Sequence, residues 1–265
     1  MEIYHQDSFI NPDIESLISV YIREYDIAKA NISILLSKGL ISYEQYNYYY
    51  NLPPDQRKIQ IGCLQRDNKE INEGLKKGFA EYRKLFFESN DLTYNDILSI
   101  KKDAIFIIDK IPRNTQFDHV VFRQKNEYTS YYRYSFMYNH YEFLYLNDSI
   151  HQIENLDVKG MGSAYQLHDN YMNDFFKCIF EAAEQDVKEA INICALFLEN
   201  YVNRSVESGY YREYNPNSKL LFNLSNIHSY YMDYLVDEKF KHMLDISFNR
   251  RIIEYFMSAY TKLII

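Results

Sequence analysis

The chain has 265 residues, a formal net charge of −8 at pH 7 and 47% hydrophobic residues, enough for one large domain or two small ones. The acidic balance argues against a protein that simply coats nucleic acid, and three distant cysteines give neither a disulfide framework nor a zinc site. The chain opens without a leader-like segment and has no apolar run near the roughly 20 residues that cross a bilayer. We therefore expect a soluble, cytoplasmic protein without a membrane partner.

The first third of the chain is predicted to be mainly helical. Apolar spacing of three and four residues predicts helices over residues 12–24, 29–37 and 68–89, with a short extended segment at 22–27. Gly39 is a good residue to end the second helix. Another helix starts at Ser42, where Gln45 completes a capping box, and it must stop before Pro53.

The rest of the chain changes from strands to helices. Aromatic and β-branched residues predict a hairpin over residues 97–109 and strands at 119–123, 128–136 and 141–146. Helical periodicity follows at roughly 164–204, 228–244 and 247–263. We therefore predict an α+β fold in two parts, a mixed domain over residues 1–155 with a short basic insertion at 56–90, and a helical region over 156–265.

Two aspartates stand out by their context. Asp26 ends an extended segment that leads straight into a helix, and Asp103 opens a strongly apolar strand. A carboxylate on a core strand is costly unless it has a partner, and a divalent metal is one such partner. Carboxylates from neighbouring strands can hold two Mg²⁺ ions for in-line phosphoryl transfer. Each aspartate alone also fits a structural role, Asp26 as a helix-start charge and Asp103 as a turn residue.

The segments around both aspartates resemble palm-type DNA polymerases, those of family B most closely and reverse transcriptases more faintly. Four short segments carry the resemblance. DIAKAN (26–31) is similar to motif A, and KKDAIFI (101–107) is similar to motif C. KNEY (125–128) is similar to the Lys/Tyr motif that touches primer–template, and LDVKG (156–160) is similar to the segment leading into the thumb. The resemblance implies a palm-like antiparallel sheet with helices, followed by an all-helical thumb-like region.

The resemblance also implies roles for individual residues. Asp26 and Asp103 would be the catalytic residues and would bind Mg²⁺ or Mn²⁺ together with the main chain of Ile27. The triphosphate would be bound by Asn31, Arg57, Lys58, Lys76 and Lys77. The primer–template or single strand would be bound by Lys125, Tyr128 and Lys159. The partners would therefore be nucleic acid and nucleoside triphosphates.

The sequence departs from the polymerase pattern in three places. Lys101 stands where motif C has its first aspartate, and no fingers motif appears between residues 40 and 96, so a partner subunit could supply the fingers. Asn31, five residues after Asp26, replaces the bulky side chain that excludes a ribose 2′-hydroxyl in these polymerases. Asn31 is smaller and can hydrogen-bond a hydroxyl, which predicts tolerance of ribonucleotides, unless it lies on a helix surface.

The leading hypothesis is a template-directed nucleotidyltransferase, a minimal DNA polymerase or primase-like enzyme that would suit a phage or other mobile element and act in the host cytoplasm. Lys101 and the acidic charge favour an alternative, a catalytically inactive polymerase-fold module that binds nucleic acid or a host or partner protein. An unrelated α+β protein with two structural aspartates stays open as a third interpretation. Zinc-hydrolase histidine pairs, a nucleophile elbow and a P-loop are missing from the sequence.

Overall fold

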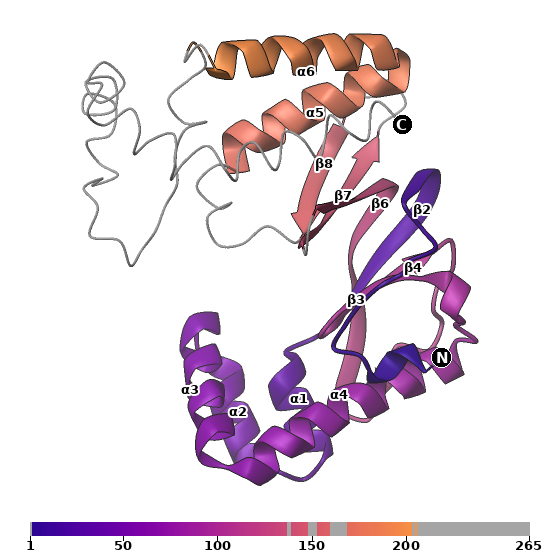
Figure 1. The fold of residues 1–265 in the computed structure, drawn as a ribbon. Coiled ribbons are helices and arrows are strands. Elements are labelled where there is room, and N and C mark those ends of the chain that lie inside the picture. Colours follow the sequence, from indigo (N-terminus) through magenta and orange to yellow (C-terminus); the bar gives the residue numbers. More distant parts are fainter. Residues whose placement is uncertain (1, 137–138, 148–152, 160–168, 203–204, 206–265) are drawn as a thin grey trace, which may run out of the picture. The chain divides into compact units, whose positions relative to one another are not determined.

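The computed structural model describes residues 2–136, 139–147, 153–159, 169–202 and 205 (Figure 1). The chain divides into two compact units, one made of Met1–Ile14 and Ile18–Thr129 and the other of Glu15–Leu17 and Ser130–Ile265. Strand β6 (Val120–Phe136) starts in the first unit and ends in the second. Both units combine antiparallel strands with helices, so the predicted α+β class is confirmed.

The first unit is an antiparallel sheet with helices on one face. Its strands lie in the order β1-β3-β4-β2-β6, with β5 paired to β6. The strands are β1 (Ser8–Ile10), β2 (Ser16–Ile27), β3 (Ile97–Lys101), β4 (Ala104–Ile108), β5 (Gln116–Phe117) and the first part of β6. The helices are α1 (Ala30–Ser37), α2 (Tyr43–Asn51), α3 (Pro54–Asp67) and α4 (Lys69–Ser89), with single 3-10 turns at Ile3–His5 and Tyr94–Asp96.

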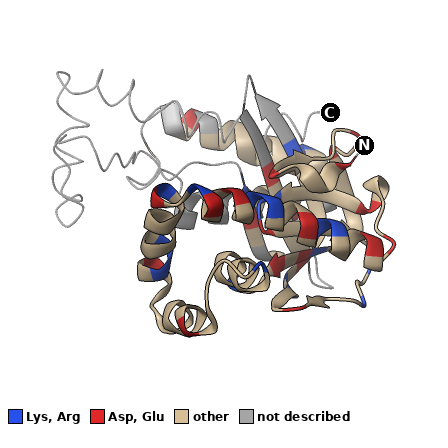
Figure 2. Ribbon diagram, turned by 90° about the horizontal axis from the view of Figure 1, so that it is seen from below, with Lys and Arg blue, Asp and Glu red and all other residues tan. Residues whose placement is uncertain are grey.

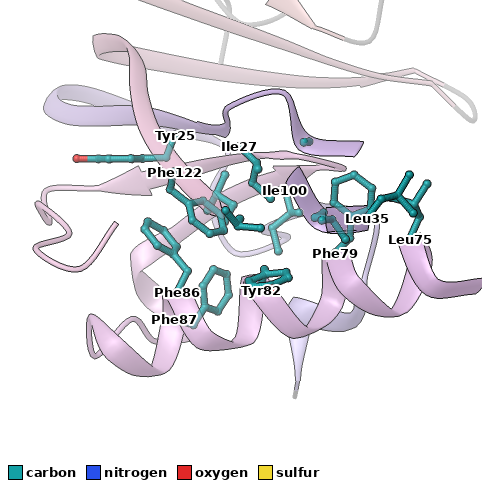
Figure 3. Close-up of a cluster of buried hydrophobic side chains, with 14 of the residues drawn as sticks. Tyr25, Ile27, Leu35, Leu75, Phe79, Tyr82, Phe86, Phe87, Ile100 and Phe122 are labelled. Carbon is teal, nitrogen blue, oxygen red and sulfur yellow. The ribbon is translucent and has the colours of Figure 1, made fainter. Parts of the chain in front are cut away.

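Helix α4 supplies more buried residues to the core of the first unit than the other helices do. Its apolar residues recur every three or four positions, so one face points at the strands, as Figure 3 shows for Phe79, Tyr82 and Phe86. Phe86 stacks on Phe122 of β6 with ring centroids 4.1 Å apart. The core around it is buried and includes residues of β2, β3, β4 and α1. This packing confirms the helix predicted over residues 68–89.

Local capping signals place the shorter helices. Ser42 accepts a hydrogen bond from the Gln45 amide and the Gln45 side chain accepts one from the Ser42 amide, which is the predicted capping box of α2. Gly39 has φ +66°, as expected after the end of α1. Helix α2 ends before Pro53, and α3 begins at Pro54, where a missing amide hydrogen is harmless.

The helix predicted over residues 12–24 is wrong, because most of that segment belongs to β2. Ile18 and Tyr21, which would share one apolar face of such a helix, are exposed, whereas Ile22 and Tyr25 are buried. A short apolar run fits either period, and pairing with β4 and β6 decides for the strand. Helix α3 was not predicted because it buries only Ile61.

In the second unit, β6, β7 (Asn139–Asn147) and β8 (Ile153–Lys159) form an antiparallel sheet. The helical region expected at 164–204 forms α5 (Asp169–Gln185) and α6 (Val187–Val202), while the helices expected at 228–244 and 247–263 lie outside the described residues. Strands and α5 are joined by stacked rings, among them Tyr145 on Phe180 at 5.1 Å. The boundary expected near residue 155 falls within β8, a strand that was not predicted. The division between the two compact units comes earlier in the chain, after Thr129.

Within the described residues, no helix is both long enough and apolar enough to cross a bilayer.

Candidate functional site

Asp26 and Asp103 are neighbours at one end of the first unit's sheet. Strand β2 pairs antiparallel with β4, and Asp26 lies directly opposite Ala104. The Ile27 amide donates a hydrogen bond to the main-chain oxygen of Asp103 at 3.2 Å. The end of β2 and the turn before β4 therefore meet, so the main chains of the two candidate metal-binding aspartates are adjacent.

Asp103 lies in the two-residue turn of the β3–β4 hairpin. Lys101 pairs with Ala104, and Lys102 has φ +57°, the left-handed conformation that the first position of such a turn requires. The Lys102 amide donates to the main-chain oxygen of Asp7 at 2.7 Å. This hydrogen bond attaches the turn to the segment that precedes β1, the strand that pairs with β3.

The side chain of Arg83 in α4 forms a hydrogen bond to the same turn. Its side chain is fully buried, and Nη1 donates to the Lys102 carbonyl at 2.6 Å. Nε donates to the Tyr4 carbonyl at 2.8 Å, and Nη2 pairs with the Asp7 carboxylate at 2.9 Å. Since Lys102 precedes Asp103, we infer that Arg83 positions the turn that carries the candidate metal ligand.

The Asp26 carboxylate already has a cationic partner. Arg123 of β6 donates from Nε to Oδ1 at 2.8 Å and from Nη2 to Oδ2 at 3.5 Å. The Asp26 side chain is 15% exposed and that of Arg123 is 62% exposed. The hydrogen bond and the negative charge of Asp26 raise the pKa of Arg123. The guanidinium thus neutralises Asp26 and occupies the oxygens that a metal would need.

Glu24 is a further acidic residue at the site that the sequence analysis missed. It precedes Asp26 by two residues, so both side chains belong to the same face of β2. The Glu24 side chain is 2% exposed and accepts hydrogen bonds from Lys125 Nζ at 3.3 Å, Asn126 Nδ2 at 2.6 Å and Tyr128 OH at 3.2 Å. The two-residue spacing was a signal for Glu24, whereas nothing local indicated Arg123.

These contacts bear on two residues expected to touch nucleic acid. Lys125 is exposed and bridges the surface to Glu24, so its ammonium group can also reach a phosphate. Tyr128 is buried to 2% exposure and directs its hydroxyl at Glu24. The Tyr128 ring therefore supports the sheet instead of presenting a surface for bases.

The basic residues expected at the triphosphate fall into two groups. Arg57 donates to the main-chain oxygen of Tyr50, which also accepts from Lys29 Nζ at 3.2 Å. Arg57 therefore lies near Lys29, which precedes α1 and follows Asp26 by three residues. Lys58 is the next residue of α3 and is exposed.

The second basic group lies at the other end of α1. Lys77 lines an open pocket together with Lys38, the residue that follows α1. An eight-residue helix is about 12 Å long, which separates this pocket from the start of α1. Three glutamates share the pocket. Acidic and basic residues are interspersed along α4 (Figure 2). Lys76 of α4 is also exposed. The structure therefore brings Arg57 and Lys58, but not Lys76 and Lys77, to the Asp26 end of α1.

The remaining two candidates have different surroundings. Asn31 lies in the first turn of α1 and is half-buried, five residues after Asp26. Lys159 ends β8 in the second unit and pairs with Asp157. Asn31 is therefore part of the candidate site, and Lys159 belongs to the other unit.

The donor set suits a hard divalent cation only in part. Asp26, Asp103 and the carbonyl of Ile27 are oxygen donors of the kind that Mg²⁺ prefers. In the part of the chain that the structure describes, no group of three or more His, Cys, Asp and Glu side chains could hold a metal. Mg²⁺ is commonly bound by one or two carboxylates and completed by water and substrate phosphates. Asp26, Asp103 and the Ile27 carbonyl would therefore hold a Mg²⁺ ion only together with water or phosphate ligands.

Comparison with protein families gives a match over almost the whole chain. The family described as Bacteriophage PBS1 gene 130 protein matches residues 1–258. The chain belongs to this family. Its description names a phage protein, in agreement with the origin expected from the sequence, and states no activity. None of the curated proteins matches the chain.

Proposed function

We propose that this member of the phage PBS1 gene 130 family is a palm-type, template-directed nucleotidyltransferase. The observation that supports it is the meeting of Asp26 at the end of β2 with Asp103 in the β3–β4 turn, joined through the Ile27–Asp103 hydrogen bond. A palm would place its two metal-binding aspartates at neighbouring main-chain positions, and the adjacency of Asp26 and Asp103 supports the proposal.

In this proposal each group has a simple task. Asp26, Asp103 and the Ile27 carbonyl would hold Mg²⁺ or Mn²⁺, which neutralises charge on the triphosphate and orients it. Arg57 and Lys58, near the start of α1, would contact the triphosphate, and Lys125 would contact the nucleic-acid backbone. Phosphoryl transfer needs positioning and charge neutralisation more than side-chain chemistry. A partner subunit supplying the fingers and a site of action in the host cytoplasm belong to the same proposal.

The test is nucleotide incorporation on primed and unprimed single strands with Mg²⁺ or Mn²⁺. We expect Asp26→Asn and Asp103→Asn each to lower incorporation at least about a hundredfold, since each removes a metal ligand. Asp118→Asn is the matched control, because Asp118 is exposed at φ +54°, where Asn is well tolerated. Incorporation that survives in both site variants would rule out the proposed metal site.

The alternative, an inactive polymerase-fold module, is favoured by one specific contact. Arg123 already pairs with Asp26, and Lys101 stands where a third carboxylate is expected. In such a module the guanidinium would replace the metal permanently. Absence of incorporation by folded wild-type protein, together with absence of Mn²⁺ binding, would favour this alternative.

A further inference from the structure

Helix α2 presents an unusual number of tyrosines to the surface. None of its residues is buried, and five of its nine residues are tyrosine. Tyr46 and Tyr49 pack against the core of the first unit. Tyr43, Tyr48 and Tyr50 are 63%, 55% and 45% exposed. Single exposed aromatic residues are common, but three on one short helix form a candidate interaction surface.

Three of these rings form a continuous row along the helix. Tyr43, Tyr46 and Tyr50 are spaced by three and four residues and therefore share one helix face. The rings of Tyr43 and Tyr46 are stacked with centroids 6.1 Å apart, and those of Tyr46 and Tyr50 lie 5.7 Å apart. Lys29 Nζ lies 2.7 Å from the Tyr50 ring centroid and ends the row. The row thus runs from open surface to a lysine that follows Asp26 by three residues.

Cations surround the Asp26 end of the row. Lys29 Nζ and Arg57 Nη1 both donate to the main-chain oxygen of Tyr50, near the end of α2. Among the ion pairs of the described residues, none joins Lys29, Arg57 or Lys58 to a carboxylate. Glu44 lies in the opposite, first turn of α2, and Asp55 lies in the first turn of α3. With Asp26 and its partner Arg123 included, the local balance is four cations against three carboxylates.

We infer that this tyrosine face of α2, together with Lys29, Arg57 and Lys58, binds single-stranded nucleic acid. Bases would stack on the exposed ring of Tyr43 and on the side of the Tyr50 ring that Lys29 does not cover, and the cations would contact the phosphates beside them. Aromatic rings next to basic groups are the common means of holding a single strand without reading its sequence. The inference rests on the proposed function, since the row would lead a strand toward Asp26.

Binding of a fluorescein-labelled twenty-residue oligothymidylate, followed by fluorescence anisotropy in EDTA, tests the inference. We expect Tyr43→Ala and Tyr50→Ala each to weaken binding about fivefold or more, because each variant removes a ring on which a base would stack. Tyr21→Ala is the matched control, since Tyr21 is equally exposed and also lies against a cation, Arg23. With three cations, the logarithm of affinity should fall with the logarithm of salt at a slope no steeper than about −2.

Several outcomes would overturn the inference. Undetectable binding by the wild type, equal affinity of the wild type and both α2 variants, or an equal loss in Tyr21→Ala would each do so. As a second measurement on the wild-type chain, an oligonucleotide carrying 5-iodouracil is photo-crosslinked and the linked peptide is identified. A link within residues 43–58 supports the inference, and links only elsewhere contradict it.

The experiment also separates this inference from the proposed enzyme. Anisotropy is measured without divalent metal, so it is independent of Asp26 and Asp103. Tyrosine-dependent binding without any incorporation would retain the strand-binding surface and reject the enzyme. Incorporation that depends on Asp26, combined with unchanged binding by the tyrosine variants, would retain the enzyme and reject the surface.

Discussion

Arg123 Nε lies 2.8 Å from the Asp26 carboxylate, although 96 residues separate the two in the chain. The neighbouring strand therefore supplies the cation that balances the best candidate metal ligand. A divalent ion at Asp26 has to compete with this guanidinium. The pair is partly exposed, so its contribution is modest, about 0.2–1 kcal/mol.

Removing the competing cation should strengthen metal binding. We expect Arg123→Gln to bind Mn²⁺ about two- to fivefold more tightly than the wild type, as judged from the electron paramagnetic resonance signal of free Mn²⁺. Arg66→Gln, which removes an exposed pair with Asp67, should leave the affinity unchanged. Equal or weaker Mn²⁺ binding by Arg123→Gln would show that Asp26 is not a metal ligand.

Arg83 should be among the most important residues for stability in the first unit. Arg83→Met would leave the Tyr4 and Lys102 carbonyls without their donor, and we expect a loss of about 3 kcal/mol in the free energy of unfolding. Urea unfolding followed by circular dichroism measures it. Lys84→Met, on the exposed side of α4, should cost less than about 0.5 kcal/mol. Similar losses in both variants would contradict this role of Arg83.

Substitution of Gly78 and of Gly62 by alanine should change the stability of the protein in opposite directions. A Cβ at Gly78 would lie 2.3 Å from Ile34 Cγ2, so Gly78→Ala should force α1 and α4 apart and cost about 1–3 kcal/mol. A Cβ at Gly62 meets nothing within 4 Å, and Gly62→Ala in helix α3 should stabilise the protein by about 0.5–1 kcal/mol. Thermal unfolding of both variants gives the signs, and equal signs would contradict the packing described.

Asp96 should make the free energy of unfolding depend on pH in the acidic range. Burial opposes ionisation of Asp96, but hydrogen bonds from Thr93 and Lys110 outweigh it and lower the pKa of Asp96. A lowered folded-state pKa stabilises the fold above the unfolded-state pKa, about 3.9, and this contribution disappears as the pH falls through the folded value. Asp96→Asn should therefore be less stable by about 1 kcal/mol at pH 7, with the difference vanishing in acid. A difference that is constant with pH would argue against the ionised contact.

If the protein incorporates nucleotides, Asn31 should affect the choice of sugar. Asn31→Tyr would place a bulky ring five residues after Asp26, and we expect the ratio of ribonucleotide to deoxyribonucleotide incorporation to fall about tenfold or more. Asn31→Ser, which keeps a small polar side chain, should leave the ratio close to that of the wild type. Strong rejection of ribonucleotides by the wild type would contradict the role proposed for Asn31.

Local sequence signals were sufficient for much of the first unit. The periodicity of α4, the capping box of Ser42 and Gln45, and the apolar runs of β3 and β4 predicted these elements, because each depends on neighbours only a few residues away. The same signals failed for β2, since a short apolar run fits a helix as well as a strand until a partner strand is known. Helix α3 was missed because it contributes a single buried side chain.

The features of the candidate site also fall into those that the sequence predicted and those that only the structure revealed. The sequence by itself determined that Asp26 lies near the end of an extended segment and that Asp103 directly precedes an apolar strand, because those contexts are local. Only the tertiary structure decided that the two are adjacent, that Arg123 pairs with Asp26, and that Glu24 binds Tyr128. The physical reason is strand register, which joins residues about 80 to 100 positions apart and which no local pattern specifies.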